Sequence, residues 1–178
     1  MIKKINSAGF TLIEMLVSIA IIITTTTVVV GILASSFTGI TKSTISEDVR
    51  QNGNSALSRM TRTIQFAESF QGVSQNGVDY INNCTLSGGE KYNYVRVKTN
   101  TQIVTLSCTD ADIMNGASSL IDKNKVGIRD GSCAITCLQE SEIVPPVLGI
   151  SFALFNAGVT NQKKTEIYFS TSVKMRNL

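Results

Sequence analysis

The sequence contains no histidine and no tryptophan, only two prolines, and few charged residues, 16% of 178. The absence of histidine excludes a Ser-His-Asp triad, a Cys-His dyad and a zinc site with histidine ligands. The net charge of +3 is small and is not gathered into a basic stripe, so the composition gives no sign of nucleic-acid binding. A hydrophobic fraction of 43% argues against disorder, and the length suits one domain with an appendage.

The hydrophobic residues are concentrated near the amino terminus. Residues 1–9 (MIKKINSAG) are polar and carry Lys3 and Lys4, and no charged residue occurs from Met15 to Thr41. This run is longer than the roughly 20 residues that a helix needs to span a bilayer. Because basic residues favour the cytoplasmic side, we expect a single-pass protein of the cytoplasmic membrane with its carboxy-terminal domain outside.

Two ordinary explanations of this run compete with a specialised one. A secretory signal peptide would be cleaved after Ala34 in GILAS, but the apolar run is too long for such a signal and contains Glu14 at its start. A plain membrane anchor has no use for Glu14. Because a carboxylate inside a membrane helix costs a few kcal/mol, an unneeded one should be disfavoured there. Both explanations are therefore disfavoured.

The segment SAGFTLIEMLVSIAIII resembles the class III signal of type IV pilins and pseudopilins. That family pattern is a short basic leader ending in glycine, then phenylalanine, then an apolar helix with glutamate as its fifth residue. The matching residues here are Gly9, Phe10 and Glu14. The resemblance implies that a prepilin peptidase removes residues 1–9 by cutting between Gly9 and Phe10, and that the new Phe10 amine is methylated.

The spacing of these residues has a physical reason. Gly9 has no side chain, so a protease can approach its backbone closely. Glu14 lies about one helical turn from Phe10, whose amine becomes an ammonium after cleavage. In a bundle of packed helices, Glu14 of one subunit can neutralise the Phe10 ammonium of its neighbour, and this pairing is stronger in a low dielectric than in water. An unpaired buried carboxylate would penalise a wrong stagger, so Glu14 is expected to set the assembly register.

Four consecutive threonines, Thr24 to Thr27, interrupt the apolar run. Their hydroxyls can bond back to carbonyls of the preceding turn, which makes them tolerable in a membrane helix. Alternatively, they form a weak point where the helix extends during assembly. We favour the first interpretation.

Helical spacing continues through residues 37–70, where one apolar stripe contains Ile45, Val49, Ala56, Met60, Ile64 and Ala67. The sequence therefore predicts one helix from Phe10 to about Phe70, with a transmembrane half at 10–36 and an amphipathic half at 37–70. Gly53 is expected to weaken it by about 1 kcal/mol relative to alanine. The segment Val49–Phe70 is loosely similar to J-type minor pseudopilins and W-type minor pilins.

The remaining chain, 71–178, is expected to form an extracytoplasmic β domain. Residues 71–91 are rich in Gly, Asn and Ser and predict a loop. Strand patterns follow at 92–97, 102–108, 119–129, 134–138, 148–156 and 165–175, the first two as a hairpin. The predicted fold class is α+β, with the long amino-terminal helix packed on an antiparallel sheet.

All four cysteines follow the predicted span, on the side of the membrane where disulfides persist. They are Cys84, Cys108, Cys133 and Cys137, and two bridges have three connectivities. We prefer Cys84–Cys108 with Cys133–Cys137. Because an extended strand would hold the last two about 13 Å apart, that pair requires a bend, and a bond from Cys108 to Cys133 or Cys137 remains open. A zinc site is disfavoured because paired CxxC spacing is absent.

Asp110 and Asp112 form the only candidate for a metal site, a weak one for Ca²⁺, since some pseudopilins bind Ca²⁺ in a loop. Further acidic ligands in order are missing, so a solvated polar loop is favoured. We expect no catalytic residues, no cofactor and no enzyme activity.

The leading hypothesis is a structural subunit, a minor one, of a type IV pilus or a type II secretion-like pseudopilus. Its implied partners are the prepilin peptidase, other pilin or pseudopilin subunits, and an inner-membrane assembly platform with its ATPase, because this chain has no P-loop. Contact with nucleic acid is expected only through the assembled machine. The alternative is a membrane-anchored extracytoplasmic binding or adhesion module that never polymerises.

Overall fold

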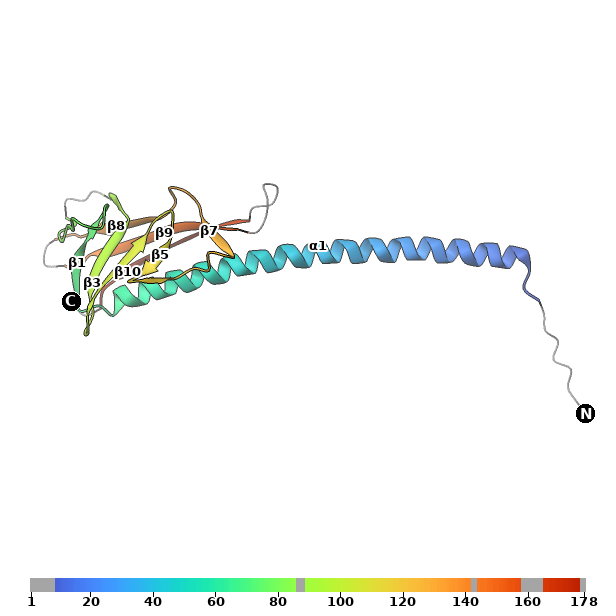
Figure 1. The fold of residues 1–178 in the computed structure, drawn as a ribbon, viewed down its shortest axis with the longest axis horizontal. Coiled ribbons are helices and arrows are strands. Elements are labelled where there is room, and N and C mark those ends of the chain that lie inside the picture. The colour runs from blue at the N-terminus through green and yellow to red at the C-terminus, as the bar shows by residue number, and fades with distance from the viewer. Residues whose placement is uncertain (1–8, 86–88, 142–143, 158–164, 177–178) are drawn as a thin grey trace, which may run out of the picture. The chain divides into compact units, whose positions relative to one another are not determined.

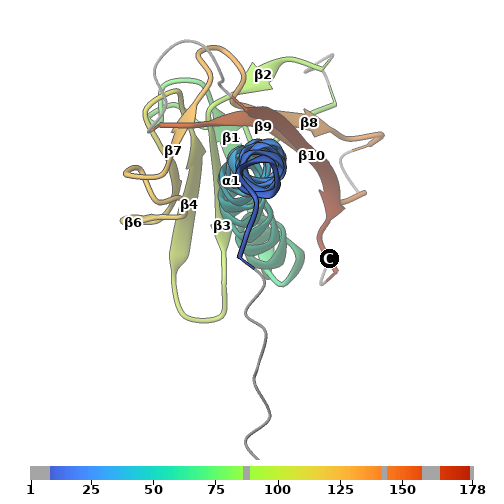
Figure 2. The same ribbon diagram turned by 90° about the vertical axis from the view of Figure 1, so that its right-hand side faces the viewer.

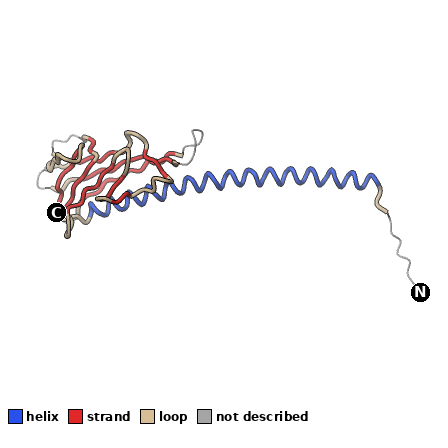
Figure 3. The backbone as a smooth tube through the Cα atoms, viewed as in Figure 1, coloured by secondary structure: helices blue, strands red, loops and turns tan. Residues whose placement is uncertain are grey.

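The computed structural model describes residues 9–85, 89–141, 144–157 and 165–176, and only the backbone of 38, 41 and 42. Of the predicted leader, Gly9 alone falls within this range. The described chain forms one long helix followed by ten strands (Figure 1; Figure 3). It comprises two compact units, Met1–Thr44 and Ile45–Leu178, which we describe separately.

Helix α1 extends over Leu12–Gln65 and therefore ends before the predicted limit at Phe70. The reason lies in the chain's last strand region: the Arg176 amide donates a hydrogen bond of 3.1 Å to the Gln65 carbonyl, which satisfies one of the free carbonyls at the helix end. The chain then turns and enters strand β1 at Ser69. Helix propensity continues beyond Gln65, but tertiary contacts end the helix there.

The strands belong to two antiparallel sheets, where the sequence predicted one. In chain order they are β1 Ser69–Ser74, β2 Lys91–Tyr92, β3 Tyr94–Lys98, β4 Ile103–Cys108, β5 Ile113–Asn115, β6 Ser118–Ser119, β7 Val126–Ile128, β8 Ala134–Leu138, β9 Val147–Asn156 and β10 Glu166–Lys174. The first sheet has the order β1-β3-β4-β5-β6, and the second has the order β10-β9-β8-β2 with β7 also paired to β9. The α+β class is thus confirmed.

Three strand predictions need correction. The predicted loop 71–91 contains most of β1, whose Gly72 has φ 127° beside a register shift, a conformation that favours glycine. Tyr92 leaves the predicted hairpin and pairs with Ile135 in the second sheet. The predicted strand 119–129 is extended only at its ends, because the amide of Asp122 donates to Asn52 Oδ1 on the helix instead of to a strand.

The core of the second unit lies between the helix and the two sheets. Figure 2 shows β3 and β4 on one side of the helix and β10 on the other. The predicted apolar stripe faces this core: Val49, Ala56, Met60, Ile64 and Ala67 are fully buried. They join one cluster with side chains of both sheets, so the amphipathic pattern was the correct signal for the packed part of α1.

Gly53 has a packing role that its sequence context did not indicate. A Cβ atom at this position would lie 2.2 Å from the Phe169 ring, which is far closer than real contacts allow. The ring therefore packs directly on the helix backbone, and it also stacks on Phe152 with ring centroids 5.4 Å apart. The residue predicted to weaken the helix is the one that lets β10 approach it.

Candidate functional site

The predicted cleavage bond lies just outside the helix. Gly9 and Phe10 have no regular secondary structure, both are exposed, and α1 begins at Leu12. A side chain added at Gly9 would meet no atom within 4 Å. Nothing in the described chain therefore requires glycine there, and the backbone at Gly9 is open to an approaching molecule.

The first turn of α1 is closed by Thr11 and Glu14. The Thr11 amide and hydroxyl both donate to Glu14 Oε2, at 3.0 and 2.8 Å, and the Glu14 amide donates to Thr11 Oγ1 at 3.3 Å. This reciprocal arrangement is a capping box, in which Thr11 is the N-cap and Glu14 the third helical residue. In the single subunit, the carboxylate is therefore held by its own helix terminus.

Thr11 is the functional residue that the sequence reasoning missed. Its signal was present, since T-x-x-E before an apolar run is the sequence pattern of a capping box. The sequence analysis assigned Glu14 to a neighbouring subunit alone, whereas the structure also pairs it with a residue three positions earlier. Thr11 belongs to the same site as Phe10 and Glu14.

Behind this turn, α1 presents a continuous apolar surface. Residues Leu12–Phe37 form a candidate membrane span of 26 residues with mean hydropathy 2.5, and none of it is buried within the chain. Every described side chain from residue 12 to residue 44 is exposed. An apolar helix of this length, in which Glu14 is the one charged residue, requires lipid or other helices around it, so the segment indicates membrane anchoring.

The four threonines within this span are satisfied by the helix itself. Thr24, Thr25 and Thr26 donate to carbonyls of Ala20, Ile21 and Ile22, and Thr27 donates to the Thr24 carbonyl. The helix continues through them without interruption. This is the back-bonding that the favoured interpretation predicted.

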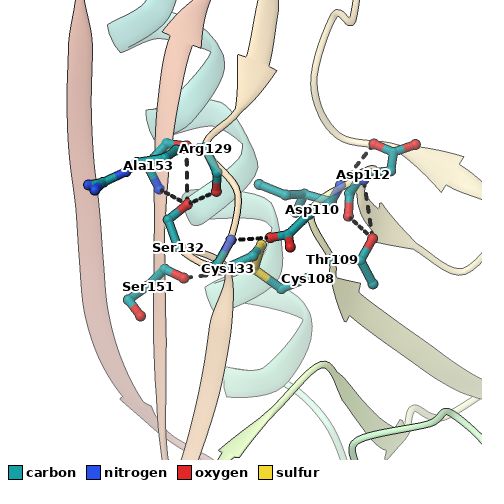
Figure 4. The surroundings of a disulfide bond; sticks show 11 residues. Cys108, Thr109, Asp110, Asp112, Arg129, Ser132, Cys133, Ser151 and Ala153 are labelled. Atoms are coloured by element: carbon teal, nitrogen blue, oxygen red, sulfur yellow. Dashed lines mark hydrogen bonds between the residues drawn. A yellow bond between two sulfur atoms is a disulfide. The ribbon is translucent and has the colours of Figure 1, made fainter.

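The disulfide pairing preferred from the sequence is wrong. The bonds join Cys84 to Cys137 and Cys108 to Cys133, with Cα–Cα distances of 5.8 and 5.3 Å. Cys137 lies within straight strand β8 and Cys133 just before it, so the two are kept apart as an extended strand requires. The Cys108–Cys133 bond connects β4 of the first sheet to the start of β8 in the second (Figure 4).

The two aspartates of the weak Ca²⁺ candidate serve different partners (Figure 4). Asp110 Oδ1 accepts the Gly131 amide at 2.9 Å. Asp112 accepts the Ile113 amide, and its other oxygen lies 2.7 Å from the Lys123 ammonium. Lys123 thus supplies a cation to Asp112 from within the chain, a role that the sequence gave no reason to expect. Among the described residues, no three His, Cys, Asp or Glu side chains could share a metal ion.

The comparisons with known proteins agree with the geometry of the amino-terminal segment. Residues 4–30 match the family model described as the prokaryotic N-terminal methylation motif, which is the class III prepilin signal. The match includes Gly9, Phe10, Thr11 and Glu14 and supports a type IV pilin-like or pseudopilin precursor. Neither the curated proteins nor the solved structures contain a match to this chain.

Proposed function

We propose that this chain is a minor structural subunit of a type IV pilus or a type II secretion-like pseudopilus. Prepilin peptidase cuts it between Gly9 and Phe10, the Phe10 amine is methylated, and the subunit polymerises through α1. Its role is structural and not catalytic. The observation that carries the proposal is the combination of the methylation motif at residues 4–30 with a 26-residue apolar span that is not buried by the rest of the described chain.

The location follows from the same features. The subunit waits in the cytoplasmic membrane with residues 1–9 inside and the disulfide-bonded domain outside, since Lys3 and Lys4 precede the span. After assembly it resides in the pilus or pseudopilus. An inner-membrane platform and its ATPase supply the energy for the transfer.

Assembly requires Glu14 to exchange partners. In the single chain its carboxylate accepts hydrogen bonds from the Thr11 amide and hydroxyl at a fully exposed position. Two opposite charges 4 Å apart attract by about 4 kcal/mol at an effective dielectric constant of about 20, and by about 1 kcal/mol in water. Once the neighbouring subunit's Phe10 ammonium comes within reach in a dehydrated helix bundle, it is therefore the stronger partner, and Glu14 turns from helix cap to register device.

The intact mass of the full chain extracted from membranes tests the proposal. With prepilin peptidase co-expressed, we expect loss of residues 1–9 and addition of one methyl group at Phe10; without it, the mass is that of the precursor. The Glu14→Ala variant is expected to insert and be cleaved normally but to enter filaments at least tenfold less. An uncut chain, or a cut near Ala34, would contradict the proposal.

The membrane-anchored binding module remains the second candidate. It is supported by the domain that two disulfides cross-link. It requires no leader cleavage and no polymerisation. Normal cleavage followed by filament incorporation would therefore exclude it.

A further inference from the structure

Strand β10 has a free edge that differs from the other sheet edges of the described chain. The edge strands β2 and β6 have two residues each. Strand β1 is longer, but it is bulged after Phe70 and covered by Ile81, which exchanges two backbone hydrogen bonds with Val73. Strand β10 has nine residues, about 30 Å by strand rise, and lies outermost in its sheet (Figure 2).

The edge of β10 lacks the features that normally prevent strand addition. Proteins protect free edges with charged side chains, prolines, bulges or short strands. Charges occur only at the two ends of β10, Glu166 and Lys174, and residues 167–173 are uncharged and contain no proline. The register with β9 runs without a shift from one end to the other. A long, regular and uncharged edge is therefore left open.

A groove of about 420 Å³ lies between this strand and α1. It is lined by Asn54, Leu57, Ser58, Thr61, Arg62, Gln65, Phe66 and Thr171. Leu57 and Phe66 supply apolar surface, and Phe66 is 49% exposed. Arg62 is the charged member of the lining, and no acidic side chain accompanies it. The groove therefore complements a segment with apolar side chains and a carboxylate.

We propose that an extended segment of a different polypeptide adds to the free edge of β10 as a further strand and seats an acidic residue on Arg62. Backbone groups of β10 provide the hydrogen bonds, as in other cases of strand addition, while the groove selects the side chains. The disulfides, the stacked aromatic rings and the ion pairs of the domain do not contribute to this contact. This surface goes beyond the filament role proposed above and does not require it.

A second copy of the chain is the wrong occupant. Phe169 packs on Gly53 and the Arg176 amide bonds to Gln65, so β10 and α1 run in the same direction. Two β10 edges paired antiparallel would place Glu166 opposite Lys174, but they would also set the two α1 helices antiparallel. Copies anchored in one membrane have parallel helices, which excludes this pairing. Parallel pairing of two β10 strands would offer Arg62 no carboxylate from residues 167–173, which contain no acidic residue, so the added strand belongs to another chain.

The test begins with photocrosslinking in the cells that make the full chain. The photoreactive residue p-benzoylphenylalanine replaces Thr171, on the helix-facing side of β10, or Ser118, an exposed residue in edge strand β6 of the other sheet, as the matched control. We expect at least tenfold more adduct at residue 171, mapped by tandem mass spectrometry to an extended segment containing Asp or Glu. No adduct, equal adducts at both positions, or an adduct only with a second, differently tagged copy would overturn the proposal.

The captured segment is then synthesised as a peptide and bound to the full chain purified in detergent. Arg62→Gln should weaken binding at least tenfold, because a charge-assisted hydrogen bond is lost. Arg59→Gln is the control, since Arg59 is exposed on the same helix but does not line the groove. Equal binding by both variants would overturn the proposal. Leader cleavage and filament incorporation, measured in parallel, report on the proposed function separately.

Discussion

The two parts of α1 differ in how hydrophobicity relates to burial, although they form one helix. From Leu12 to Thr44 the sequence is mainly apolar with only Glu14 and Lys42 charged, and every described side chain is exposed. From Ile45 to Gln65 the sequence is amphipathic, and Val49, Ala56, Met60 and Ile64 are fully buried. The second part packs against the sheets of the same chain, whereas the first part has the exposed apolar surface of a helix suited to lipid or to other helices. The more hydrophobic part is thus the one that contributes least to the fold of the single subunit.

The largest expected effect is a loss of unfolding free energy caused by a substitution in the second part of α1 but not by one in the first part. Met60→Ala removes a fully buried side chain from the core and should lower the free energy of unfolding by about 2–5 kcal/mol. Val29→Ala, at a position 54% exposed, should leave it unchanged. Denaturant unfolding of the full chain in detergent, followed by near-ultraviolet circular dichroism of the tyrosines, measures both. Equal losses would show that the amino-terminal part also packs within the subunit.

The disulfides should matter only for the second part. The Cys108→Ala/Cys133→Ala variant loses the bond between the sheets, and we expect unfolding free energy to fall by about 3 kcal/mol. Removing the Cys84–Cys137 bond should cost a similar amount or slightly more, because it closes a longer loop of the chain. Both variants are compared by chemical denaturation. Leader cleavage should remain normal, and failure of cleavage in either variant would contradict the separation of the two parts.

A smaller effect is expected at Gly53, where propensity and packing predict opposite signs. Helix propensity alone predicts that Gly53→Ala stabilises the protein by about 1 kcal/mol. Because the new methyl group would collide with the Phe169 ring, we expect destabilisation by about 1–3 kcal/mol instead. The same substitution in a Phe169→Leu background should be less harmful. Thermal or denaturant unfolding that shows a more stable Gly53→Ala protein would contradict this account.

The smallest effect concerns the capping box at the start of α1. Thr11→Val keeps the shape of the side chain but removes its hydroxyl, which should cost about 1 kcal/mol locally. Faster amide hydrogen exchange in the first helical turn, measured in detergent micelles, is the expected result. Thr11→Ser should behave like the natural protein. Unchanged exchange in Thr11→Val would show that Thr11 does not hold Glu14.

Much of this molecule could be predicted from local patterns. The apolar run, the spacing of Gly9, Phe10 and Glu14, and the period of the stripe in α1 each depend on residues close in sequence. Strands β8, β9 and β10 agree with their predicted positions because alternation is strong there. The T-x-x-E pattern at Thr11 is also local, and it predicts the capping box that the structure contains.

The sequence by itself determined the long apolar segment near the amino terminus, the prepilin signal motif and the α+β class, because these follow from composition and short-range periodicity. Only the tertiary structure decided the disulfide pairing, the division into two sheets, the end of α1 at Gln65 and the role of Gly53. Each of these depends on which distant segments meet: Cys84 and Cys137 are 53 residues apart in the sequence, and Gly53 lies under Phe169 of strand β10. Such contacts are fixed by the packing of the whole core, and no local pattern records them.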